Sequence, residues 1–136
     1  MAVVSLCLLG AASARAAEPF KVIVNARMTG RAISRQSIAQ VFLGRVERWG
    51  DGHAIAPVDL STTSTTRAAF SQAVLDMSVL AVRQYWTRTI ASGHFPPPVR
   101  TADEDVIAFV AGRPGAIGYV SAEALLPDTV RVVAVQ

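Results

Sequence analysis

Phe20 to Asn25 reads FKVIVN, a run of apolar and β-branched residues interrupted by one lysine. A run of this length and composition predicts a buried strand rather than a helix. A second run of the same kind, VRVVAV, covers residues 130–135. An all-helical fold would leave both runs without a role, so these two segments indicate that the chain contains a sheet.

Two further apolar segments between these runs also predict strands. They read AIAPVDL over residues 54–60 and AIGYV over residues 116–120. Pro57 has no N–H to donate to a neighbouring strand. We therefore expect the 54–60 strand to lie at a sheet edge or to bend at Pro57.

Apolar residues spaced three and four apart predict four helices between the strands. Ser34 is the expected N-cap of the first helix, and Gly44 its expected end. Residues 101–104 (TADE) match the capping box, which predicts that Thr101 caps the fourth helix. The expected buried faces are Ile38, Val41 and Phe42; Ala69, Phe70, Ala73, Val74 and Met77; Val82, Trp86 and Ile90; and Val106, Phe109 and Val110.

The expected order of elements is therefore β-α-β-α-α-α-β-β. Strands that alternate with helices favour an α/β layer fold with a partly parallel, mixed sheet of about four to five strands. A chain of 136 residues has room for one ordinary domain. Its 51% hydrophobic and 17% charged residues exclude general disorder.

The first 17 residues predict a secretory signal peptide. Residues 2–12 (AVVSLCLLGAA) carry no charge, and Ala14-Arg-Ala16 supplies a small-residue cleavage pattern. The run is shorter than the roughly 20 apolar residues that cross a bilayer. The alternative is a buried N-terminal helix. With cleavage after Ala17, the mature domain covers residues 18–136 and loses Cys7, the single cysteine, which excludes thiol catalysis and disulfides.

The charge pattern gives little support to nucleic-acid binding. The chain has 13 Lys and Arg against 10 Asp and Glu, a formal net charge of +3, but the basic residues are scattered rather than clustered. Paired-cysteine, HExxH and carboxylate-rich loop motifs do not occur in the sequence, so we expect neither a metal nor another cofactor.

The titratable residues do not form a catalytic pattern in the sequence. His53 and His94 are the only histidines, and we expect both to be exposed in separate loops. No nucleophile and base are spaced as in a hydrolase, so the chain is not expected to be an enzyme. Residues 103–105 (DED) fall in the first turn of a predicted helix, where the helix dipole favours negative charge, and are expected to be structural.

Residues 61–66 (STTSTT) form a run of six hydroxyl side chains where a predicted strand ends and a helix begins. The first N–H groups of a helix lack intrahelical partners and carry partial positive charge. Ser64, Thr65, Thr66 and Arg67 are therefore candidate anion-binding residues. The alternative is that Ser64 only caps the helix. Because Arg67 lies near the positive end of the dipole, we also expect an anionic ligand or a carboxylate beside it.

Four segments in the same order resemble the periplasmic phosphate-binding protein family, type 2 periplasmic binding proteins that serve phosphate uptake transporters. Residues 38–52 (IAQVFLGRVERWGDG) resemble a helix that ends in an Ile-Phe-Leu-Gly-Lys type sequence. Residues 57–70 (PVDLSTTSTTRAAF) resemble the segment with the family's Ser-Gly-Thr phosphate motif. Tyr85-Trp86 and Ser92-Gly93 fit the following stretch, and residues 114–120 (PGAIGYV) match the late strand.

This resemblance covers residues 20–135 and implies a single three-layer α/β lobe, as in the short relatives of the family. It implies non-enzymatic binding of phosphate or a related small oxyanion in the periplasm, with a membrane transporter or sensor as partner. The alternative is a protein-interaction or structural module that keeps the scaffold without the ligand. Both alternatives remain open at the level of the sequence.

The resemblance also assigns residues to the phosphate motif. Ser64 and Thr66 match its Ser and Thr, whereas Thr65 replaces the Gly between them. Leu60 stands where the family has an Arg near the phosphate, and Thr62 stands where it has an acidic residue. The departures weaken the electrostatic part of the site, because a charge is missing at two positions.

Overall fold

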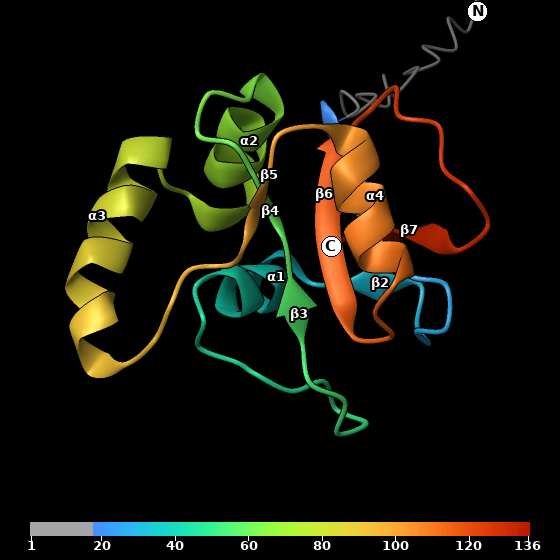
Figure 1. Ribbon diagram of the computed structural model, residues 1–136, viewed down its shortest axis with the longest axis horizontal. Helices are drawn as coiled ribbons and strands as arrows, with labels where there is room; N and C mark the ends of the chain where they lie inside the picture. The colour runs from blue at the N-terminus through green and yellow to red at the C-terminus, as the bar shows by residue number, and fades with distance from the viewer. Residues whose placement is uncertain (1–17) are drawn as a thin grey trace, which may run out of the picture.

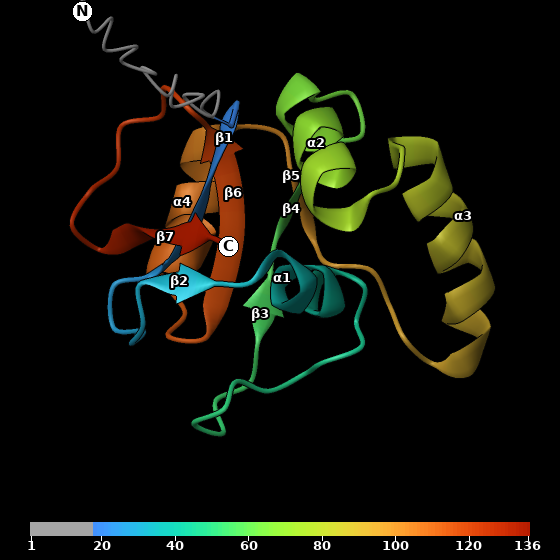
Figure 2. The same cartoon turned by 180° about the vertical axis from the view of Figure 1, so that it is seen from behind.

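The computed structural model describes residues 18–136, so the predicted signal peptide and Cys7 lie outside the described residues. The described chain forms a mixed five-stranded sheet with helices on both of its faces (Figures 1 and 2). Its strands are β1 (Phe20–Asn25), β2 (Ala32–Ile33), β3 (Ala56–Pro57), β6 (Ala116–Ser121) and β7 (Val130–Val135). The predicted α/β class and mixed sheet are confirmed.

The helices and a small second sheet complete the fold. Two-residue strands β4 (Asp59–Leu60) and β5 (Val99–Arg100) pair in parallel beside the main sheet. The helices are α1 (Arg35–Phe42), α2 (Thr65–Phe70), α3 (Val79–Thr89) and α4 (Asp103–Ala111), with a π-helical stretch η1 (Ser71–Leu75) and a 3₁₀ turn η2 (Ile90–Ser92). None of the helices in the described chain is long and apolar enough to cross a membrane.

The sheet has the order β2-β7-β1-β6-β3, with β1 at its centre. Strand β1 is antiparallel to both β6 and β7, while β2 and β3 add in parallel at the two edges. Consecutive residues Val22, Ile23 and Val24 are all fully buried. Successive side chains of a strand point to opposite faces, so burial of all three requires that both faces of the sheet are covered.

Two neighbouring residues of β6 show which helices cover which face. A Cβ added at Gly118 would meet Val106 and Val110 of α4 at 2.8 and 3.3 Å, so this position faces α4. The ring of the next residue, Tyr119, stacks on Phe70 of α2 with centroids 3.8 Å apart. It also lies beside the ring of Phe42, the last residue of α1. Helix α4 therefore covers one face, and α1 and α2 cover the other, in three layers.

The predicted strand over residues 54–60 is divided into two. Residues Ala56 and Pro57 form β3 at the edge of the main sheet, as the proline predicts, whereas Asp59 and Leu60 pair with β5. Because β4 leaves the main sheet, it carries the chain into the layer of α2. The following loop, residues 61–66, is held at the end of β4.

Serine hydroxyls cap three of the helices. Ser34, Ser64 and Ser78 each accept a hydrogen bond from the N–H three residues later. Gly44 follows α1 with φ of 69° and packs against the ring of Trp86, which is buried as predicted.

The capping box predicted for α4 is wrong. The helix begins at Asp103 with Ala102 as its N-cap, and no side chain caps it. The Asp103 carboxylate accepts instead from the Ser121 N–H at 3.2 Å and from its hydroxyl at 2.6 Å, at the end of β6. Asp103, Glu104 and Asp105 fall in the first turn of the helix, as predicted.

Candidate anion-binding site

A buried polar network lies directly beneath the hydroxyl run. The Asp59 carboxylate on β4 accepts a hydrogen bond from the Tyr119 hydroxyl and another from the Leu60 N–H, at 3.0 Å. Arg67 Nη1 lies 3.2 Å from Asp59 Oδ2 and donates to the Leu60 carbonyl at 2.7 Å. The network therefore joins α2 to the end of β4 and to β6.

Water is largely excluded from the network, and this burial shifts the pKa values of two of its members, Asp59 and Tyr119. Burial raises the pKa of the Asp59 carboxyl, although the charge of Arg67 and the Tyr119 hydroxyl oppose that rise. Burial, with the negative charge of Asp59 beside it, also raises the pKa of Tyr119 far above its ordinary value. The Tyr119 hydroxyl consequently stays protonated and serves as a donor.

The loop of residues 61–66 is held by its own hydrogen bonds. The Ser64 N–H donates to the Ser61 carbonyl at 2.9 Å, and the Ser61 and Thr63 hydroxyls lie 3.1 Å apart. Ser64 Oγ accepts from the Arg67 N–H at 3.2 Å, which is the predicted cap. These contacts fix the backbone of the loop, so its remaining donors have defined positions.

The donors of the loop that remain unbonded are the first N–H groups of α2, which have no partner within a helix. Within the described residues, the N–H groups of Thr65 and Thr66 have no intramolecular acceptor. Thr62 and Thr65 are exposed, and Ser64 keeps its hydroxyl proton free to donate, because its oxygen is the acceptor in the cap. The structure thus brings Ser64, Thr65 and Thr66 together at one surface of α2.

Arg67 differs from the other candidate residues in its position. Its side chain is buried beneath the loop, and its charge is directed at Asp59 rather than into solvent. Of the two partners expected for Arg67, an anion or a carboxylate, the structure shows the carboxylate. Sequence reasoning missed Asp59 and Tyr119 as members of the site, and the only signal for them was the unfavourable place of Arg67 next to the helix dipole.

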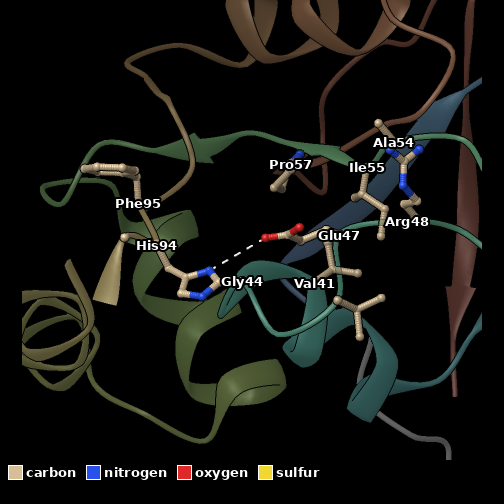
Figure 3. A pocket seen from close by; sticks show the side chains of 11 residues that line it. Val41, Gly44, Glu47, Arg48, Ala54, Ile55, Pro57, His94 and Phe95 are labelled. Carbon is tan, nitrogen blue, oxygen red and sulfur yellow. Dashed lines mark ion pairs between the residues drawn. The ribbon is translucent and has the colours of Figure 1, made fainter. Parts of the chain in front are cut away.

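The two histidines lie in surface loops, as predicted. His53 Nδ1 lies 3.0 Å from Asp51 Oδ2 within one turn, and His94 Nδ1 lies 3.6 Å from Glu47 Oε1. The second pair borders an open pocket of about 430 Å³ between the end of α1, β3 and the His94 loop (Figure 3). Its lining contains no Ser, Thr or Cys nucleophile. Within residues 18–136, no cluster of three His, Cys, Asp or Glu side chains could hold a metal ion.

No family model matches the sequence, and no curated protein does. Solved structures match it well. One from Clostridium perfringens, described as a phosphate ABC transporter substrate-binding protein with bound phosphate, is 20% identical with a TM-score of 0.68. An ABC-type phosphate transport receptor from Vibrio cholerae is 16% identical with a TM-score of 0.67. PstS from Borrelia burgdorferi is 13% identical with a TM-score of 0.65.

The chain has the fold of the phosphate-transporter substrate-binding proteins. The matches cover 86%, 86% and 87% of this chain in the same order. They cover only 44%, 46% and 47% of those proteins, so the chain spans less than half of their length. The fold of one lobe is therefore shown.

Proposed function

We propose that this chain binds phosphate or a related small oxyanion, without catalysis, at the loop of residues 61–66. We further propose that it does so in the periplasm, as a component linked to a phosphate transporter or sensor. Support for this proposal comes from the fold, which it shares with substrate-binding proteins for phosphate transport, one of them with bound phosphate. The fold alone does not assign a ligand, so the donors of the loop carry the argument.

The observation that carries the proposal is the pair of N–H groups at Thr65 and Thr66, which find no acceptor among residues 18–136. They lie at the positive end of α2, beside the hydroxyls of Ser64 and Thr66. Arg67 adds positive charge from beneath the loop, and Asp59 offsets it. These donors suit a small oxyanion because each of its oxygens accepts several hydrogen bonds.

Half of a site should bind weakly by itself. A dianion that leaves water needs many donors to replace its hydration. Leu60, at the position where the family carries an Arg, is buried in the core and supplies none. The chain also spans less than half of the solved relatives, which are about twice as long. We therefore propose that a second copy, or another protein, supplies the remaining donors.

The sharpest test removes the donors of one residue, the N–H and the hydroxyl of Thr65, from the start of α2. Thr65 is the first residue of α2, a position at which proline fits a helix well and its missing N–H breaks no helical bond. The residue before it, Ser64, has the extended backbone that proline requires (φ −72°, ψ 128°). Thr65→Pro should therefore preserve the fold and abolish phosphate binding measured by titration calorimetry.

The matched control is Val79→Pro at the first residue of α3, which also follows an extended serine cap. This variant should bind phosphate like the unaltered protein. Equal loss in both variants, or binding by Thr65→Pro at full affinity, contradicts the loop as the site.

The alternative function is a protein-interaction module on the same scaffold. It is favoured by the neutralised charge of Arg67 and by large apolar side chains exposed around α3, namely Leu80 at 60% and Phe95 at 71%. Under this alternative, phosphate leaves the protein unaffected, and Leu80→Ser with Phe95→Ser weakens capture of the partner in cross-linking on intact cells.

A further inference from the structure

A second pocket lies between α3 and the two-stranded sheet of β4 and β5. Its volume is about 230 Å³. Helix α3 contributes Arg83, Trp86 and Thr87, and Ile90 follows at the start of η2. The four share one face because they are spaced by three, one and three residues. Across from them lies the proline-rich chain that enters β5, including Pro97.

The lining of this pocket is divided along its length. Arg83 precedes Ile90 by seven residues, or about 10 Å along a helix axis. Arg83 supplies the charge at the first end of this face. The Thr87 hydroxyl, one turn later, donates to the Arg83 carbonyl at 3.0 Å and so leaves the guanidinium as the donor that faces a ligand. The apolar part is formed by Trp86, Ile90 and Pro97. An inorganic oxyanion would leave this apolar wall unused.

Among the residues that the structure describes, the charges that line the pocket leave one cation, Arg83, without a counter-ion. Asp59 and Arg67 both border it, and they neutralise each other in their ion pair. Within the described residues, no carboxylate lies within ion-pair distance of Arg83, and α3 contains no Asp or Glu. One free guanidinium matches a single negative charge, so a carboxylate suits it better than a dianion.

We propose that this pocket binds a small organic monocarboxylate with an apolar body. The carboxylate accepts hydrogen bonds from the Arg83 guanidinium, and the body lies against Trp86 and Ile90. The pocket adjoins the loop, because Thr62 and Arg67 also line it, but its ligand is an organic monocarboxylate rather than the inorganic oxyanion proposed for the loop. The inference therefore goes beyond the function proposed above and does not depend on it.

The test is titration calorimetry of the protein with 4-methylpentanoate, with its neutral amide 4-methylpentanamide, and with acetate. We expect the branched acid to bind at least about tenfold more tightly than the amide, which lacks the charge, and than acetate, which lacks the body. Arg83→Gln should weaken binding of the acid by about tenfold or more, while Arg88→Gln, also on α3 but outside the pocket, should leave it within about twofold.

Two further variants complete the design. Ile90→Ser, at a half-exposed position, should reduce the preference for the branched acid over acetate. Thr65→Pro should retain binding of the acid even where it loses phosphate, which separates a failure here from a failure of the proposed function. Absence of binding at 10 mM acid (on the order of a weak metabolite affinity), equal binding of acid and amide, or equal losses in Arg83→Gln and Arg88→Gln would overturn the proposal.

Discussion

Arg67 of α2 and Asp59 of β4 form an ion pair of 3.2 Å whose side chains are only 8% and 11% exposed. The pair holds the loop of residues 61–66 from beneath, because Arg67 also donates to the Leu60 carbonyl immediately before it. It also explains why an arginine is tolerated next to the positive end of a helix. Its charge belongs to the core network rather than to the surface of the loop.

Removing one member of this pair should destabilise the protein strongly. Arg67→Met leaves Asp59 buried without its counter-ion, and we expect a loss of about 3–5 kcal/mol in the free energy of unfolding. The double variant Arg67→Met with Asp59→Asn should recover most of that loss, because Asn still accepts from Tyr119 without a charge. Urea unfolding measures the free energy of unfolding of the unaltered protein, the single variant and the double variant.

Arg88→Met is the control for that series, because Arg88 is exposed on α3 and makes no ion pair within the described residues. A surface change of this kind should alter stability by no more than about 0.5 kcal/mol. If Arg67→Met costs no more than this control, the pair does not support the fold.

The burial of Asp59 predicts a pH dependence. Its pKa in the folded protein lies above the ordinary value of 3.8, so the folded state holds the proton more tightly than the unfolded state does. The stability that Asp59 contributes is then fully present below pH 3.8 and falls as the pH rises through the folded pKa. The stability difference between the unaltered protein and Asp59→Asn should therefore shift in favour of the unaltered protein on acidification. Urea unfolding at a series of pH values measures this difference in the free energy of unfolding. If acidification instead favours Asp59→Asn, the ion pair with Arg67 outweighs the effect of burial on Asp59.

Two glycines near the end of α4 should respond differently to alanine. A Cβ at Gly115 would lie 2.0 Å from the Ala54 carbonyl oxygen, so the backbone leading into β3 would have to move. We expect Gly115→Ala to destabilise by at least about 1–3 kcal/mol in thermal or urea unfolding. At Gly112 the nearest atom lies 3.4 Å away, an ordinary contact, and φ is −85°. Gly112→Ala should change stability little, and equal effects of the two substitutions would contradict this packing.

Much of the fold was predictable because its long strands carry β-branched runs. Strand β1 covers the FKVIVN segment, and β7 covers VRVVAV. The two-residue strands β2 and β5 were missed, since pairs of that length have no periodic pattern of their own. The π-helical turn of η1 was also missed, because its sequence reads like a continuation of the helix before it. The capping box was wrong because α4 begins at Asp103 with Ala102 as its N-cap, one residue later than a cap by Thr101 requires.

The candidate site was predictable only at its surface. The hydroxyl run and its place at a helix start are local features, and the cap by Ser64 followed from them. The burial of Arg67 did not, because Asp59 and Tyr119 are separated by 60 residues and meet only when β4 leaves the sheet beside β6. The roles of Ser64, Thr65, Thr66 and Arg67 in anion binding remain predictions.

The most direct test of the central claim is thermal unfolding of the protein with and without phosphate, with sulfate at matched ionic strength as the control. A ligand at 100 times its dissociation constant stabilises the folded state by about 2.7 kcal/mol, a shift of several degrees for a domain of this size. We expect a shift that is larger for phosphate than for sulfate and is lost in Thr65→Pro. An equal response to the two salts, or no response to phosphate at millimolar concentration (where Kd of 1 mM corresponds to about −4.1 kcal/mol), would contradict anion binding and favour the interaction module.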